Sequence, residues 1–268
     1  MPELPEVESV RRQLEPALRG RTIVSTWHDP HPAQRFHDVE AARGHRIEDV
    51  GRRGKYLILE LDRDRELVLH LGMTGSFRID DGEDTDVHDR ARFALDDGRL
   101  LSFRDPRRFG RVSVVGTGDR TVIPMLAALG PEPLTDAFDP EVFADDLRRS
   151  RAPVKALLLG QRLVAGVGNI YADESLWRAR IHPASRRVGH DRAVRLHQHI
   201  QEVLAAAIER EGTTFRDYQM VNGASGRYAT FLDVYGKAGL PCPRCGTTLR
   251  RSLVAQRGTT HCPRCQRG

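Results

Sequence analysis

The chain has 268 residues, a net charge of +5 and four cysteines. This length suits about two domains. No apolar run approaches the ~18 residues that span a bilayer. A secretory signal has a basic region followed by an apolar stretch, whereas the first residues here are acidic, so we expect a cytosolic protein without such a signal. Residues 237–268 hold seven basic residues and no acid. This excess favours a polyanionic partner, with nucleic acid the leading candidate.

A helix is predicted at the start of the chain. Pro5 suits the first turn, where its missing N–H costs nothing. Apolar residues then recur at spacings of three and four and form one buried stripe, which consists of Leu4, Val7, Val10, Leu14 and Leu18. If Met1 is removed, Pro2 presents a free secondary amine, a potential nucleophile, in front of this helix. The alternative is that Glu3, Pro5 and Glu6 are simply favourable first-turn residues.

The following segment indicates a mainly antiparallel β-sandwich or barrel. Residues 22–51 carry no clear pattern, and a basic loop with Arg52, Arg53 and Lys55 follows. Strands are predicted for six apolar or alternating segments separated by turn signals, at residues 56–61, 67–71, 76–79, 91–95, 100–104 and 111–115. Residues 80–89 carry six acids. We expect a solvated loop there, pointing away from any polyanion.

Two turns between these strands carry large side chains. They are residues 72–75, with Met73, and residues 105–110, with Arg107 and Phe109. Met73 and Phe109 could fold back into the core, as most such side chains do. The other interpretation is a wedge. An enzyme that acts on a base in a duplex must take it out of the stack, and apolar groups with an arginine can fill the gap.

The pattern changes at residues 130–133, Gly-Pro-Glu-Pro, where we expect a domain boundary. Helices are predicted beyond it, at residues 140–149, 154–159, 171–180 and about 192–211. Gly166 and Gly168 open a tight turn, and Asn169 is placed to cap the next helix. This is either ordinary helix–turn–helix architecture or a backbone that approaches a phosphate closely. Further on, residues 223–229 are either a plain linker or a mobile lid.

The four cysteines form two pairs, Cys242-x2-Cys245 and Cys262-x2-Cys265, sixteen residues apart. Four thiolates at this spacing can bind one zinc ion tetrahedrally between two short hairpins. Metal binding of order 10–16 kcal/mol would supply the folding energy that a segment of about thirty residues lacks. Disulfides are the alternative, which a cytosolic location disfavours. We therefore predict one structural zinc ion.

Several of these strings resemble one family. Residues 1–8, M-P-E-L-P-E-V-E, resemble the N-terminus of formamidopyrimidine-DNA glycosylases, in the wider family that includes endonuclease VIII. Residues 163–183 resemble the helix-two-turn-helix element of the same family, and the cysteine segment resembles its zinc ribbon. The resemblance implies an α+β multidomain fold, with an N-terminal antiparallel β-sandwich and flanking helices, then a helix-two-turn-helix domain ending in a four-cysteine zinc ribbon. We expect domains at residues 1–130, 139–236 and 237–268, with a linker at 131–138.

The resemblance also implies an activity. A bifunctional DNA glycosylase and abasic-site lyase of base excision repair would remove oxidised purines, 8-oxoguanine and formamidopyrimidines, and then cut the strand by β,δ-elimination. The Pro2 amine would attack C1′ of the flipped nucleotide and form a Schiff base, and Glu3 would be the general acid. Glu6 would support this pair. Lys55 would hold a phosphate beside the lesion.

The remaining roles that the resemblance implies concern DNA contacts. Met73, Arg107 and Phe109 would form the wedge. Asn169 and Arg257 would contact phosphates, and Lys155 would lie at a pocket where the two domains meet. His88 would add a backbone contact, unless it is a solvated loop histidine. Only Lys55, Lys155 and Lys237 are lysines among 42 basic residues, so the first two sites either need lysine geometry or keep it by chance.

The expected partner is double-stranded DNA carrying an oxidised base, bound by a monomer at the nucleoid of the bacterial cytoplasm, without a membrane. Two alternatives stay open. An endonuclease VIII-type enzyme would prefer oxidised pyrimidines, although its wedge residues usually differ, and a non-catalytic zinc-ribbon protein would leave Pro2 idle. In the formamidopyrimidine branch a lid loop usually ends in Gly-Tyr-Phe. Here residues 227–229 are Arg-Tyr-Ala, so the base preference is also open.

Overall fold

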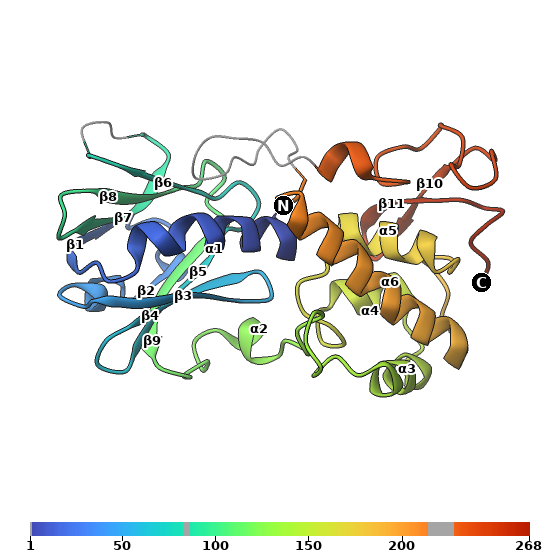
Figure 1. The fold of residues 1–268 in the computed structure, drawn as a ribbon, viewed down its shortest axis with the longest axis horizontal. Coiled ribbons are helices and arrows are strands. Elements are labelled where there is room, and N and C mark those ends of the chain that lie inside the picture. Colours follow the sequence, from blue (N-terminus) through green and yellow to red (C-terminus); the bar gives the residue numbers. More distant parts are fainter. Residues whose placement is uncertain (1, 83–85, 214–227) are drawn as a thin grey trace. The chain divides into compact units, whose positions relative to one another are not determined.

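The computed structural model describes residues 2–82, 86–213 and 228–268 (Figure 1). The chain forms two compact units. The first contains Met1–Ala127 together with Glu211–Ala229, and the second contains Ala128–Arg210 and Thr230–Gly268. The chain therefore returns to the first unit late in the sequence before it completes the second. In the described part of the chain, no helix is both long enough and apolar enough to cross a membrane.

The first helix, α1 (Leu4–Leu18), confirms the predicted apolar stripe. Val10, Leu14 and Leu18 have no exposed surface, and the helix packs against strand β3 (Ile47–Arg53). Burial of such side chains contributes about 1.5–3 kcal/mol each. The stripe therefore fixes the orientation of α1 and of the residues that precede it.

Two sheets complete the first unit. One has the strand order β1-β7-β8-β6 and the other β2-β9-β5-β4-β3, and every pairing is antiparallel except that of β2 with β9. Side chains from both sheets join one hydrophobic cluster, which includes Leu57, Leu69, Phe93 and Phe103. The other strands are β1 (Ile23–His28), β2 (Phe36–His37), β4 (Tyr56–Leu61), β5 (Arg65–His70), β6 (Ser76–Asp80), β7 (Asp89–Leu95), β8 (Leu100–Arg104) and β9 (Arg111–Gly116).

The strand predictions are confirmed for six strands, but three more lie where no pattern was visible. Strands β1, β2 and β3 all fall within residues 22–53. The acidic segment 80–89 also departs from the expectation of a fully solvated loop, because Asp89 is buried at the start of β7 and pairs with Arg92 at 3.0 Å. Residues 83–85 lie outside the described residues.

The second unit is helical and ends in a hairpin. Its helices are α3 (Pro140–Arg149), α4 (Val154–Leu159), α5 (Asn169–Arg178) and α6 (His190–Glu209), and the hairpin strands are β10 (Arg250–Val254) and β11 (Arg257–His261). Helix α2 (Pro124–Ala127) and the short 3₁₀ helices at Ala33–Arg35, Val39–Ala42 and Tyr228–Phe231 complete the elements. The predicted helices at 171–180 and 192–211 each begin and end two residues earlier than expected.

Candidate functional site

Pro2 and Glu3 lie directly before α1, and both are buried. The backbone N–H of Glu3 donates to Oε2 of Glu6 at 2.8 Å. This is one half of a capping box, in which the third helical residue reaches back to the residue before the helix. Glu6 therefore fixes the backbone of Glu3, and with it the residue that would carry the amine.

The second carboxylate oxygen of Glu6 binds a distant segment. Its Oε1 accepts hydrogen bonds from the backbone N–H of Thr213 at 2.7 Å and from the Thr213 hydroxyl at 3.0 Å. Gly212 has a φ of +76°, and a Cβ there would lie 2.6 Å from Oε1 of Glu6. The close approach and the backbone conformation both require glycine. Glu6 thus joins the start of α1 to the segment that precedes residues 214–227, which lie outside the described residues and include most of the predicted lid.

Lys55 lies in the turn between β3 and β4 and is only 4% exposed. Its neighbour Tyr56 pairs across the sheet with His70, and the two rings are 4.7 Å apart. Burial, together with the charges of Lys55, Arg111 and Arg35, lowers the pKa of His70 to about 4. The three cations Lys55, Arg35 and Arg111 around the neutral imidazole of His70 suit an anion. His70 was not among the residues predicted from the sequence. The one feature that could have indicated it is its position as a polar residue at the end of an apolar strand.

The two predicted turn tips contact each other. The hydroxyl of Thr74 donates to Oδ1 of Asp105 at 2.5 Å, and a Cβ on Gly72 would lie 2.6 Å from the backbone nitrogen of Gly110. Asp105 is fully buried and also accepts from the N–H of Gly110 at 2.7 Å. The backbones of the two tips are therefore locked together.

This contact brings the three wedge candidates close to one another. Phe109 is 39% exposed rather than folded into the core, and the guanidinium of Arg107 lies 5.1 Å from the centre of its ring. Met73 is half-buried. His88 lies beside the second tip, where its carbonyl accepts from the N–H of Asp105 at 2.9 Å.

Asn169 does not cap α5, contrary to the sequence prediction. The N-cap is Gly168, and Asn169 is the first helical residue. Its Nδ2 donates to the carbonyl of Gly258 at 3.0 Å. Its Oδ1 is buried and accepts no hydrogen bond from any residue that the structure describes. The prediction was wrong because a glycine at this turn leaves the asparagine free to reach the hairpin instead.

Lys155 lies in the interior of the second unit. Its side chain and that of Asp173 have no exposed surface, and Nζ lies 2.6 Å from Oδ1 of Asp173 and 2.8 Å from the hydroxyl of Thr259. Burial raises the pKa of Asp173 to about 6, although the charge of Lys155 and hydrogen bonds act in the opposite direction. A lysine without exposed surface is positioned to support the hairpin rather than to touch a phosphate.

Strand β11 is tied to α5 at several points. Oδ2 of Asp173 accepts from the N–H of Thr260 at 2.9 Å, and the hydroxyl of Thr259 donates to the carbonyl of Arg257 at 3.0 Å. Arg257 itself is exposed at the start of β11. The turn before it has positive φ at Ala255 (51°) and Gln256 (58°), the conformation of a type I′ hairpin. Arg257 and Asn169 therefore lie on two elements, β11 and α5, that are hydrogen-bonded to each other.

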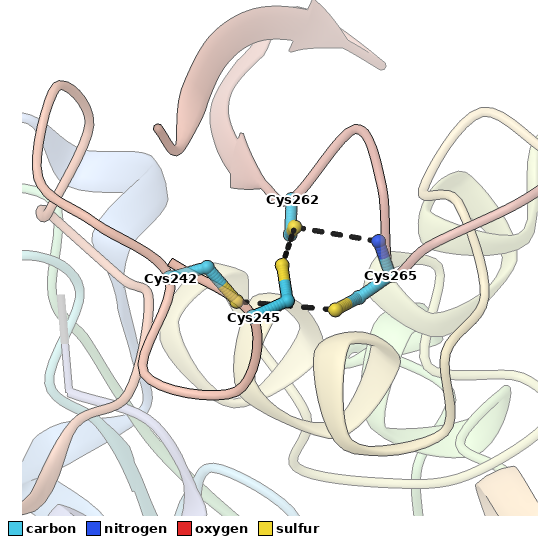
Figure 2. A group of neighbouring side chains, drawn as sticks. All are labelled: Cys242, Cys245, Cys262 and Cys265. Carbon is cyan, nitrogen blue, oxygen red and sulfur yellow. Dashed lines mark hydrogen bonds between the residues drawn. The ribbon is translucent and has the colours of Figure 1, made fainter. Parts of the chain in front are cut away.

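The four cysteine sulfurs all lie within 4.8 Å of one another. Figure 2 shows the four side chains gathered around a common centre. Sγ of Cys242 is 4.0 Å from that of Cys265, and Sγ of Cys245 is 3.5 Å from that of Cys262. Zn–S bonds of about 2.3 Å in a tetrahedron place sulfurs roughly 3.8 Å apart, so the set fits one zinc ion. Nε1 of Trp177, on α5, donates to Cys242 at 3.4 Å. Four thiolates leave no open position, so the zinc is structural.

Comparisons with known proteins match this arrangement along the whole chain. Family models match residues 1–112 (formamidopyrimidine-DNA glycosylase N-terminal domain), residues 129–219 (formamidopyrimidine-DNA glycosylase H2TH domain) and residues 239–268 (zinc finger found in FPG and IleRS). The chain is 48% identical to a formamidopyrimidine-DNA glycosylase of Deinococcus radiodurans, covering 99% of this chain and 97% of that protein.

Solved structures agree with these matches. A crystal structure of MutM (Fpg) from Thermus thermophilus is similar with a TM-score of 0.92 and 48% identity, covering 99% of this chain and 98% of the other. A complex of a Lactococcus lactis Fpg variant with Fapy-dG-containing DNA has a TM-score of 0.91 and 38% identity, covering 100% of both chains.

Proposed function

This chain belongs to the formamidopyrimidine-DNA glycosylase family, and from that premise we propose which of its residues carry the chemistry. It is a DNA glycosylase of base excision repair, in a family that also has lyase activity at abasic sites. Membership across 99% of the chain leaves no support for a non-catalytic zinc-ribbon protein. The observation that carries the residue assignment is the arrangement in which Glu6 holds Glu3 beside Pro2.

Pro2 is the nucleophile of this proposal. After loss of Met1, its secondary amine attacks C1′ of the extruded nucleotide, the C1′–N bond to the base breaks, and the base leaves with the electron pair and takes up a proton. As the sugar C1′–O4′ bond opens, Glu3 donates a proton to O4′ and an iminium forms between Pro2 and C1′. A secondary amine gives an iminium without an N–H to lose. It therefore stays a cationic electron sink while the 3′ phosphate and then the 5′ phosphate are eliminated.

Glu6 acts through Glu3 and Thr213 rather than on the substrate. Its two oxygens are committed to backbone N–H groups and a hydroxyl. It is a positioning residue, and it couples the nucleophile to the segment that ends at Thr213.

The proposed DNA contacts rest on charge and on the resemblance to the family. We assign a phosphate beside the lesion to Lys55 with His70, and further phosphates to Asn169 and Arg257. His88, next to the wedge, adds a backbone contact. Lys155 supports the hairpin that carries Arg257, and this role replaces the direct contact expected from the sequence. Met73, Arg107 and Phe109 fill the stack vacated by the flipped nucleotide.

The substrate of this proposal is double-stranded DNA with an oxidised purine. The matched wedge set and the relatives named formamidopyrimidine-DNA glycosylase support the purine preference over that of an endonuclease VIII-type enzyme. Bacterial relatives and a DNA substrate also support a cytoplasmic protein associated with the nucleoid.

Borohydride reduction tests the mechanism. The zinc-loaded protein is mixed with a duplex carrying 8-oxoguanine and reduced, and a covalent protein–DNA adduct is expected. A Glu3→Gln variant should lose most glycosylase activity because it lacks the proton donor, while keeping adduct formation on a preformed abasic site. An equal adduct yield from a Pro2→Gly variant that retains Met1 would overturn the assignment of Pro2.

A further inference from the structure

A hollow of about 910 Å³ lies beside the zinc-binding cysteines, entirely within the second unit. Five guanidinium groups surround it, and no aspartate or glutamate is among the described residues that line it. The lining consists of Arg180, Arg192, Arg244, Cys245, Arg264, Cys265, Arg267 and Gly268. We call it the arginine hollow.

Many other arginines in the described part of the chain have a carboxylate partner, and the five in the hollow do not. Arg11, Arg108 and Arg178, for example, each pair with a carboxylate at 3.1 Å or less. Within the described ranges, none of the five arginines of the hollow lies within ion-pair distance of a side-chain carboxylate. The protein has 37 acidic residues, yet these five neighbouring guanidinium groups have no described acidic side chain as a partner. The positive charge of the hollow is therefore available to a ligand.

Neutral groups hold two of these arginines in place. Arg192 donates to the carbonyl oxygen of Arg267 at 2.6 Å. Arg244 donates to the carbonyl of Trp177 at 3.1 Å, and its guanidinium lies 4.2 Å from the centre of the Trp177 ring. Such contacts fix a guanidinium without neutralising it. The hollow is therefore partly preorganised.

The zinc centre does not account for all of this charge. One Zn²⁺ with four thiolates carries a net charge of −2, and five guanidiniums carry +5. Subtracting two from five leaves an excess of three positive charges. A main-chain carboxylate at Gly268, to which Arg192 also donates at 3.3 Å, would remove one of these. The hollow stays positive in either case, which suits binding of phosphates.

We propose that the arginine hollow binds the phosphodiester backbone of DNA, at a second contact distinct from Asn169 and Arg257. Arg257 begins β11, and the zinc-binding Cys262 directly follows the last residue of this strand, five residues further on, which corresponds to about 16 Å. Planar guanidinium forks match phosphate oxygens. A protein partner is less suitable, because the lining offers no large apolar side chain to anchor an interface, whereas phosphate contacts alone sustain non-specific DNA binding.

Charge removal at exposed positions tests this site in the full-length, zinc-loaded protein. The test variant is Arg180→Gln/Arg264→Gln/Arg267→Gln, whose side chains donate no hydrogen bond to a described residue. The matched control, Arg148→Gln/Arg149→Gln/Arg195→Gln, removes the same charge from exposed positions of α3 and α6. The affinity for undamaged duplexes is measured across a salt series. One duplex is only long enough to cover the proposed catalytic site, and the other is much longer.

The slope of log K against log salt should fall in magnitude by about 2–3 in the test variant, because each phosphate that is no longer neutralised accounts for about 0.9. The slope should stay near the parent value in the control. If the hollow holds the same duplex, only the long duplex shows this change. If the hollow instead holds a second duplex, the parent protein should move from its bound duplex to competitor DNA at a rate that rises with the concentration of the competitor. In the test variant this rate should not depend on the competitor concentration.

Equal behaviour of the test and control variants in both assays would overturn the proposal. Loss of zinc from the test variant alone would also overturn it, because the arginines would then serve the zinc centre. Binding of polyglutamate but not DNA through these arginines would replace it with a protein partner. Borohydride trapping of the parent protein reports the proposed chemistry separately, so failure of one proposal is distinguishable from failure of the other.

Discussion

The ammonium group of Lys155 lies 2.6 Å from the carboxylate of Asp173, and neither side chain reaches the surface. Both also bind β11, through the hydroxyl of Thr259 and the N–H of Thr260. A buried charge pair therefore connects the helix that starts at Asn169 with the strand that starts at Arg257. The two phosphate ligands that we propose, Asn169 and Arg257, are thus positioned by a charge pair without exposed surface.

Lys155→Met should destabilise the second unit by about 3–5 kcal/mol, because it leaves a buried carboxylate without its partner. The double variant Lys155→Met/Asp173→Asn should recover much of this loss, since an amide oxygen can still accept from Thr260. Denaturant unfolding measures both. The DNA affinity should fall in Lys155→Met and recover in the double variant, in parallel with the stability. If Lys155 contacted a phosphate directly, the double variant would still bind DNA weakly.

The pKa of His70, lowered to about 4, predicts a pH-dependent stability. The unfolded imidazole has a pKa near 6.5 and takes up a proton first as the pH falls. The native state should therefore lose stability from about pH 6.5 down to pH 4. The His70→Gln variant should lack this component, which we expect to be about 1–3 kcal/mol at its largest. NMR titration checks the cause directly, and an imidazole titrating near 6.5 would contradict it.

Glu6→Ala should slow excision as well as lower the stability. Loss of the capping contact costs about 1–2 kcal/mol, but it also frees the backbone of Glu3 and the segment at Thr213. We expect single-turnover excision to fall at least about tenfold, which corresponds to ~1.4 kcal/mol in the barrier. The control is Glu60→Gln on the exposed face of β4. Equal rates for the two variants would show that the carboxylate of Glu6 has no positioning role.

Zinc removal should release the hairpin from α5. Trp177 is one of two tryptophans in the chain and donates to Cys242, so its fluorescence should change when a chelator removes the metal. Loss of the metal also removes most of the folding energy of this small segment. DNA affinity should drop to that of an Arg257→Ala variant or below. Unchanged affinity in the chelated protein would show that the hairpin does not need the metal.

The sequence predicted those parts of the fold that depend on local periodicity or spacing. The stripe of α1 and the four-cysteine cluster follow from residues close together in the chain, and the structure contains both. Strand β2 has only two residues, β1 carries too little alternation to be recognised, and β3 is broken by Gly51 and its arginines. Their pairing partners, rather than their own residues, make them strands.

Contacts between distant residues were beyond prediction from the sequence. Glu6 and Thr213 are 207 residues apart, and nothing in either segment indicates the other. The resemblance to the family placed Lys155 at a pocket that contacts DNA, but its burial depends on Asp173 and Thr259, which only the folded chain places beside it. Asn169 similarly looked like a helix cap because its hairpin partner, Gly258, is 89 residues away.

The site of the covalent bond tests the central claim most directly. The protein is trapped with borohydride on a duplex carrying 8-oxoguanine, digested with trypsin and nuclease, and mapped by mass spectrometry. We predict that the adduct lies on the first tryptic peptide, at the nitrogen of Pro2, in protein that has lost Met1. An adduct on Lys55 or any other residue, or trapping by protein that retains Met1, would contradict the account.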